Sequence, residues 1–110
     1  MSVDKTHYVL LGLKINSIDD YWNEKYLPYI EGHPDVEYRL IVDQMSGEYA
    51  FFGKVLAFGG KYEGIPVTEI NIYDIIDIRE QSKILDKAEE LFIKKFSTED
   101  INLYAFTDKF

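Results

Sequence analysis

The sequence contains no cysteine, two histidines and three prolines among its 110 residues. The absence of cysteine excludes a disulfide framework, a thiolate nucleophile and a zinc site with Cys ligands. No apolar run approaches the roughly 20 residues that a membrane span requires, and the apolar stretch at residues 8–13 is too short for a secretory signal. We therefore expect a cytoplasmic protein without membrane contact, whose core is held by packing alone.

Positive charge is also scarce, because 12 Lys and Arg stand against 20 Asp and Glu, for a net charge of −8. Nucleic-acid binding depends on basic residues that replace counterions, so we expect no direct contact with nucleic acid. The excess acid serves solubility or, alternatively, shapes a surface that occupies a partner's basic site. The nine Tyr and seven Phe, with many Ile, Lys, Asp and Asn, are what AT-rich codons encode. We therefore expect a low-GC bacterium or one of its phages as the source, with the host cytoplasm as the location in the second case.

Hydrophobic residues make up 46% of the chain and aromatic residues 15%, which is ample for one core. The chain is too short to build a second core, and no repeat, linker or low-complexity tract divides it. We therefore predict a single α+β domain over residues 1–110.

Hydrophobic periodicity predicts five strands and two helices. The strands are expected at residues 7–15, 36–45, 48–58, 67–73 and 101–107. The first helix is expected to begin at Ser17, with Pro28 ending or kinking the regular helix near Leu27 and one further turn ending at Gly32. The second helix is expected at residues 79–96. The order β-α-β-β-β-α-β is a ferredoxin-like order with one extra strand, in which two helices pack on one face of a mainly antiparallel sheet. In the second strand, Arg39 and Ile41 are expected on a solvent-facing side.

Three glycines beside a lysine, in VLAFGGKYEGIPVTEI at residues 55–70, are the nearest approach to a chemical motif. A Walker-type phosphate loop needs four residues between its first glycine and a Gly-Lys-Ser/Thr, whereas six separate Gly53 from Gly60, and Tyr62 stands where Ser or Thr should. A dinucleotide fingerprint must open a helix, whereas a strand is expected here. We therefore predict a connection between strands in which glycines supply positive φ angles, with Tyr62 and Glu63 at its tip.

Residues suited to catalysis or metal binding form no complete pattern. His33 with Asp35 supplies only part of a coordination shell, and His7 stands alone at the start of a strand. Asp74 and Asp77 are the carboxylate pair with the least structural reason, but on a strand they would point to opposite faces. We predict no catalytic residue, metal or cofactor. The alternative left open is a small α+β enzyme or metabolite-binding protein that uses His7 or His33 with Asp74 or Asp77.

Aromatic rings wrap more than a narrow stripe of the first predicted helix and lie beside acids. Tyr and Trp are enriched where proteins anchor to one another, although core packing with the hydroxyls at the surface is the simpler explanation. If the rings are exposed, they and the glycine connection offer an acidic, aromatic surface to a protein partner. The candidate residues are Asp19, Asp20, Tyr21, Glu24, Tyr29, Tyr62 and Glu63.

The first hypothesis is therefore a small acidic protein that is not an enzyme and acts by binding another protein with a basic site. A phage-encoded modulator of a host factor, or a mimic of nucleic-acid charge, is one form that this could take. A further alternative is a self-associating structural subunit, a homo-oligomer that pairs through the apolar strand at residues 48–58 or through an exposed sheet edge.

Overall fold

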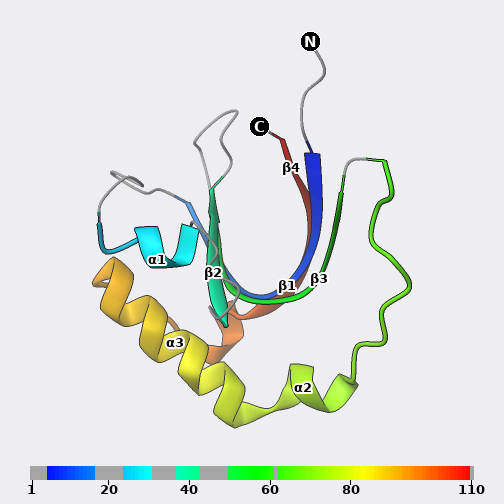
Figure 1. Cartoon of the computed structure of the whole chain (residues 1–110). Helices are drawn as coiled ribbons and strands as arrows, with labels where there is room; N and C mark the ends of the chain where they lie inside the picture. The colour runs from blue at the N-terminus through cyan, green and yellow to red at the C-terminus, as the bar shows by residue number, and fades with distance from the viewer. Residues whose placement is uncertain (1–4, 17–23, 31–36, 43–49, 61, 110) are drawn as a thin grey trace.

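The computed structural model describes residues 5–16, 24–30, 37–42, 50–60 and 62–109 (Figure 1). This part of the chain is α+β, with one four-stranded antiparallel sheet in the order β2-β3-β1-β4 and three helices. The elements are β1 (Lys5–Ile15), α1 (Leu27–Ile30), β2 (Tyr38–Val42), β3 (Ala50–Gly60), α2 (Ile72–Ile76), α3 (Ile78–Phe92), the 3-10 turn η1 (Thr98–Asp100) and β4 (Asn102–Lys109).

The two long strands at the centre of the sheet, β1 and β3, place two glycines directly opposite each other. β1 lies between β3 and β4, and Gly12 pairs with Gly53 of β3 and with Asn102 of β4. A Cβ added to either glycine would overlap the backbone of the other strand. The close approach of β1 and β3 at this point therefore depends on both glycines. The sheet curves strongly about these strands (Figure 1).

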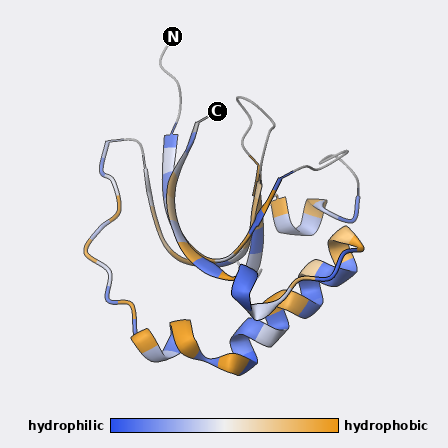
Figure 2. Cartoon of the chain, turned by 180° about the vertical axis from the view of Figure 1, so that it is seen from behind, coloured by the Kyte–Doolittle hydropathy of each residue, from blue (hydrophilic) through white to orange (hydrophobic). Residues whose placement is uncertain are grey.

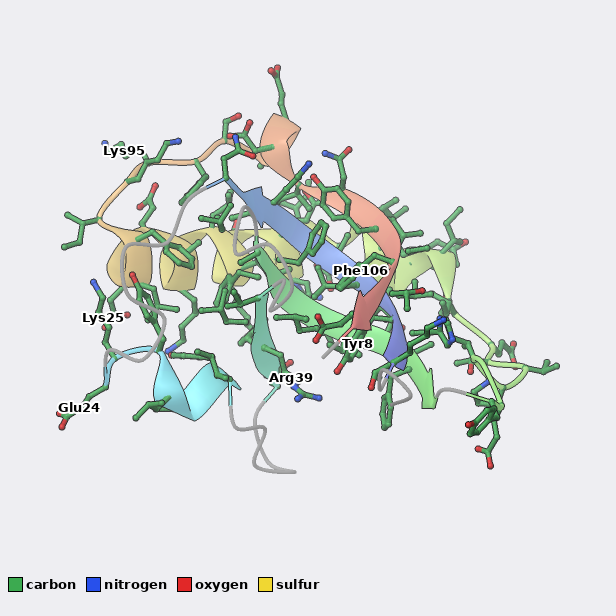
Figure 3. The ribbon with its side chains drawn as sticks, turned by 90° about the horizontal axis from the view of Figure 1, so that it is seen from above. Tyr8, Glu24, Lys25, Arg39, Lys95 and Phe106 are labelled. Carbon is green, nitrogen blue, oxygen red and sulfur yellow. The ribbon has the colours of Figure 1, made fainter. Side chains whose placement is uncertain are left out.

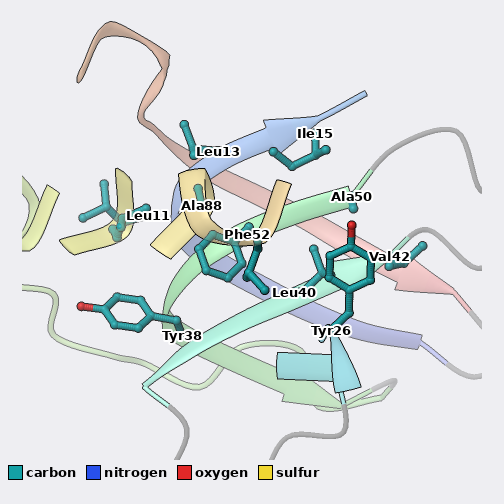
Figure 4. Close-up of a cluster of buried hydrophobic side chains, with 12 residues drawn as sticks. Leu11, Leu13, Ile15, Tyr26, Tyr38, Leu40, Val42, Ala50, Phe52 and Ala88 are labelled. Atoms are coloured by element: carbon teal, nitrogen blue, oxygen red, sulfur yellow. The ribbon is translucent and has the colours of Figure 1, made fainter. Parts of the chain in front are cut away.

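The main core lies between α3 and the convex face of the sheet. Phe52 is fully buried there, and α1 brings Tyr29 edge-on against it, with ring centroids 5.7 Å apart. The helix α3 buries the stripe that its periodicity predicted. The buried cluster contains Leu11, Leu13, Ile15, Tyr26, Tyr38, Leu40, Val42, Ala50, Phe52, Ile84, Ala88 and Leu91 (Figure 4).

The concave face of the sheet has its own apolar cluster, made of Tyr8, Leu10, Ile41 and Phe51 with Val55, Tyr104 and Phe106 packed against them. The rings of Phe51 and Phe106 stack with centroids 4.1 Å apart, and Tyr8 stacks on Phe106 at 5.5 Å (Figure 3). The prediction that Ile41 faces solvent is therefore wrong, because this side chain is only 6% exposed and packs with these rings.

The predicted strand at residues 67–73 is wrong. The described sheet therefore has four strands instead of five, and the β-α-β-β-β-α-β order is not confirmed. Residues 65–71 form no strand, and α2 begins at Ile72. The reason is local, because the Asn71 side chain accepts a hydrogen bond from the backbone N–H of Tyr73 at 2.9 Å and caps a helix. The apolar alternation of this stretch was therefore a poor guide to its backbone.

The predicted helices differ from the observed ones at their ends. Residues 17–23 of the first predicted helix lie outside the described residues. Within the described residues, α1 is a single turn with Pro28 at its second residue, a position that tolerates proline. The second ends at Phe92 rather than at residue 96, because Ile93 takes a left-handed conformation with φ of 51°. No helix in the described ranges is both long and apolar enough to span a membrane.

Candidate interaction surface

Exposed apolar side chains concentrate in one short stretch of the described chain. Of its ten exposed large hydrophobic residues, eight lie between residues 58 and 78. One is Phe58 on β3, and the other seven are Tyr62, Ile65, Val67, Ile72, Tyr73, Ile76 and Ile78. We name residues 62–78 the apolar arm. Figure 2 shows hydrophobic residues along this arm, which includes α2 and loops out from the sheet.

The arm leaves β3 through a turn that depends on glycine. Gly64 has a φ of 63°, and its N–H donates to the carbonyl of Gly60 at 3.0 Å. A Cβ on Gly59 would overlap the carbonyl oxygen of Gly64, so the arm passes directly over the β3 backbone. The prediction that a glycine supplies a positive φ here is confirmed at Gly64, although the connection leads to a helix and not to a strand.

The other end of the arm is fixed by capping groups and by one apolar contact. Ile75 packs against the main core, and its carbonyl accepts a hydrogen bond from the Gln81 side chain at 3.1 Å. Asp77 separates α2 from α3 and caps the latter, since its carboxylate accepts from the N–H of Arg79 at 2.9 Å. The arm is therefore attached at both ends and follows a defined course.

Between these ends the arm has almost no internal support. For residues 65–70, the hydrogen bond found within the described chain runs from the Thr68 hydroxyl to the Pro66 carbonyl, at 2.9 Å. The side chain of Val67 is fully exposed, and Ile72 and Tyr73 are 64% and 73% exposed. Exposed apolar side chains that gather in one region of a protein often mark an interaction site.

Every charge on the arm is negative. Residues 62–78 contain Glu63, Glu69, Asp74 and Asp77 and no Lys or Arg. The hydrogen bond from the Arg79 N–H holds the pKa of Asp77 below its ordinary value, so this carboxylate is ionised at neutral pH. The surface that the arm offers is apolar and acidic.

Of the seven residues that the sequence nominated for protein binding, the four that the structure describes do not form one patch. Tyr62 and Glu63 are exposed on the arm, whereas Glu24 is exposed before α1, and the arm and α1 lie at opposite sides of the sheet (Figures 1 and 3). Tyr29 packs on Phe52 and belongs to the core. The remaining candidates, Asp19, Asp20 and Tyr21, lie outside the described residues.

Among the described residues of the enzyme alternative, His7 is not brought together with Asp74 or Asp77 either. His7 Nδ1 lies 2.8 Å from the Thr107 hydroxyl across the β1–β4 ladder, far from α2, whose residues include Asp74 (Figure 1). Asp77 serves as a helix cap, and His33 lies outside the described ranges. Among the described residues, no group of three or more His, Cys, Asp or Glu could hold a metal ion.

A hollow of about 330 Å³ lies on the other side of the molecule, where Lys14, Lys94 and Lys95 face Glu99 and Asp100. Asp100 accepts a hydrogen bond from the Ser97 N–H at 2.8 Å, which closes the turn η1. Among the described residues, His7, Asp74 and Asp77 do not line this hollow.

The sequence identified the tip of the arm but not the surface as a whole. The apolar residues between Ile65 and Ile78 match a buried strand in spacing and composition, and the capping residues Asn71 and Asp77 were the available sign of helices. No family model matches the chain, and comparisons with curated proteins and with solved structures found no significant match.

Proposed function

We propose that this protein acts by binding another protein through the apolar arm at residues 62–78. The observation that carries the proposal is the concentration of seven exposed hydrophobic side chains in this segment, which has no cation. Burial of such side chains is the main favourable term in protein association. The tyrosines Tyr62 and Tyr73 are of the residue type that most often anchors interfaces.

The chemistry of the arm selects the kind of partner. Its apolar side chains require an apolar groove, and its four carboxylates favour basic groups at the rim of that groove. Residues 65–70 are unpaired in the described structure, so this backbone could also add as a strand to a sheet edge of the partner. This fits the hypothesis of a small acidic binding protein, for which a modulator of a host factor or a charge mimic is one form.

The test compares two identical substitutions at exposed isoleucines. Ile72→Asn changes the arm, and Ile93→Asn removes an exposed apolar side chain outside it. A partner is captured from lysate with the wild-type chain, purified and titrated against each variant. The affinity is expected to fall about tenfold or more for Ile72→Asn, which corresponds to about 1.4 kcal/mol, and to stay unchanged for Ile93→Asn.

A second arm substitution, Val67→Asn, should weaken the same complex, and added salt should weaken it further because the rim contacts are ionic. Equal affinities for the wild type, Ile72→Asn and Val67→Asn would contradict the proposal, and so would a partner that protects only surfaces outside residues 62–78.

The alternative of a metabolite-binding protein depends on the hollow beside Lys14, Lys94 and Lys95, because His7, Asp74 and Asp77 do not line it. Its three lysines outnumber its two carboxylates, Glu99 and Asp100, so an anion is the expected ligand. Inorganic phosphate titrated into the protein would shift the amide signals of residues 94–100 if this alternative holds, and would leave them unchanged if it does not.

A further inference from the structure

The outer edge of β4 lacks the features that protect an exposed strand. β4 pairs with β1 alone, and its outer backbone from Asn102 to Thr107 has no hydrogen-bond partner in the described residues. Natural edge strands are blunted by charge, proline or a covering element. Residues 102–107, NLYAFT, contain neither charge nor proline, and Leu103 is 49% exposed.

The opposite edge of the sheet differs in length, in charge and in having a covering element. β2 is five residues long and carries Arg39, and α1 packs against it. The two edges of one sheet are therefore unequal, and β4 is the one prepared for pairing.

We infer that β4 pairs with β4 of a second copy of this chain, antiparallel about a twofold axis at Ala105. An antiparallel strand is complementary to its own copy, because each residue meets its partner in both directions. Centring the pair on Ala105 places Tyr104 opposite Phe106, Leu103 opposite Thr107 and Asn102 opposite Asp108 of the other copy.

This register agrees with the chemistry of the strand. Asp108 is the one charged residue in 102–108, and it meets Asn102 rather than another acid. Tyr104 and Phe106 already lie in the aromatic cluster of the concave face, with Phe51 at 4.9 and 4.1 Å. Pairing them across the axis joins two such clusters, and aromatic cross-strand pairs stabilise antiparallel ladders.

The net charge of −8 on each copy opposes association, but this repulsion acts over a distance and is screened by salt. The dimer is therefore expected to tighten as salt is added. Salt is expected to strengthen this dimer but to weaken the complex between the arm and a basic partner. The salt dependence therefore distinguishes the two surfaces, and either proposal can be refuted without the other.

The chain has no native cysteine, so single-cysteine variants report the register directly. In the inferred dimer, Ala105→Cys places two Cα atoms about 4.5–5.5 Å apart, within disulfide range. Leu103→Cys is the matched control, because its two copies lie about 13 Å apart along the ladder. Mild oxidation of the full-length protein should link Ala105→Cys and leave Leu103→Cys unlinked.

The charged variant Ala105→Lys tests the same surface without a cross-linking reaction. Ala105 is exposed, so the variant should fold with an unchanged circular dichroism spectrum and sediment as a monomer where the wild type sediments as a dimer. The inference is overturned by a wild type that stays monomeric over a concentration series in high salt. It is equally overturned by linking at Leu103→Cys, or by Ala105→Lys dimerising like the wild type.

Discussion

At the scale of single residues, the tightest constraint is the contact between Gly12 and Gly53. Each lies where a side chain would collide with the neighbouring backbone, so the contact between β1 and β3 requires both glycines. Gly12 stands within an apolar strand pattern, where a lone glycine suggests a bulge or a close approach. The partner at Gly53 could not be found from the sequence, because the register of the ladder determines it.

Gly12→Ala or Gly53→Ala should lower the free energy of unfolding by about 1–3 kcal/mol, the usual cost of forcing extra volume into a packed site. Gly60→Ala is the control, since nothing lies within 4 Å of a Cβ there and it should cost nothing. Urea unfolding of the three variants decides the matter, and equal stabilities for all three would refute the steric account.

The hydroxyl of Tyr38 forms the second residue-scale contact with a clear consequence. It donates to Glu80 Oε1 at 2.9 Å, and Lys54 Nζ lies 3.9 Å from the same oxygen. Tyr38→Phe removes a hydrogen bond to a charged group and should lower the free energy of unfolding by about 1.5–3 kcal/mol. Urea unfolding at neutral pH measures this loss, and a variant as stable as the wild type would contradict it.

The same contact predicts an alkaline pH dependence. Burial, followed by the hydrogen bond to Glu80, raises the pKa of Tyr38. A raised pKa in the folded state means that the stabilisation is complete below the ordinary tyrosine pKa of about 10 and is lost as the pH rises above it. Between neutral pH and about pH 11, Tyr38→Phe should therefore lose less stability than the wild type.

At the scale of elements, the strands and α3 could be predicted from the sequence, and the arm could not. β1, β3 and β4 follow runs of apolar and aromatic residues bounded by polar residues, and β1 and β3 bury residues on both faces. Residues 67–73 alternate, but a strand needs a neighbour to pair with, and no described strand lies beside this segment. Two side-chain caps, Asn71 and Asp77, instead begin helices there, so the exposed surface arose where local capping prevailed over the apolar pattern.

The cap at Asp77 predicts an acid-dependent loss of stability. Because the Arg79 N–H lowers the pKa of Asp77, the cap contributes fully above the ordinary aspartate pKa of about 3.9 and is lost as the pH falls below it. Asp77→Ala should therefore unfold at lower urea concentration than the wild type at neutral pH, with a smaller difference in acid.

Asp74→Ala is the matched control for the cap, because Asp74 is exposed and its side chain forms no hydrogen bond or ion pair within the described residues. Asp77→Asn keeps an oxygen that can accept from Arg79 and should retain more stability than Asp77→Ala. If Asp74→Ala and Asp77→Ala destabilise the protein equally, the capping assignment is wrong.

At the scale of the whole molecule, the core and the interaction surface are separate. The convex cluster is closed by α1 and α3 and the concave cluster by its own rings, while the exposed apolar side chains lie on a segment that loops away from both. Substitutions on the arm should therefore change binding and leave folding intact. Ile72→Asn and Val67→Asn are each expected to alter the free energy of unfolding by less than about 0.5 kcal/mol, as measured by urea titration.

The central claim is that residues 62–78 are the surface that a partner covers. Amide hydrogen exchange of the purified protein, measured alone and in complex with its captured partner, tests this most directly. The account predicts fast exchange at residues 65–70 in the free protein and strong protection of those amides in the complex. Protection that appears elsewhere while residues 65–70 still exchange fast would contradict it.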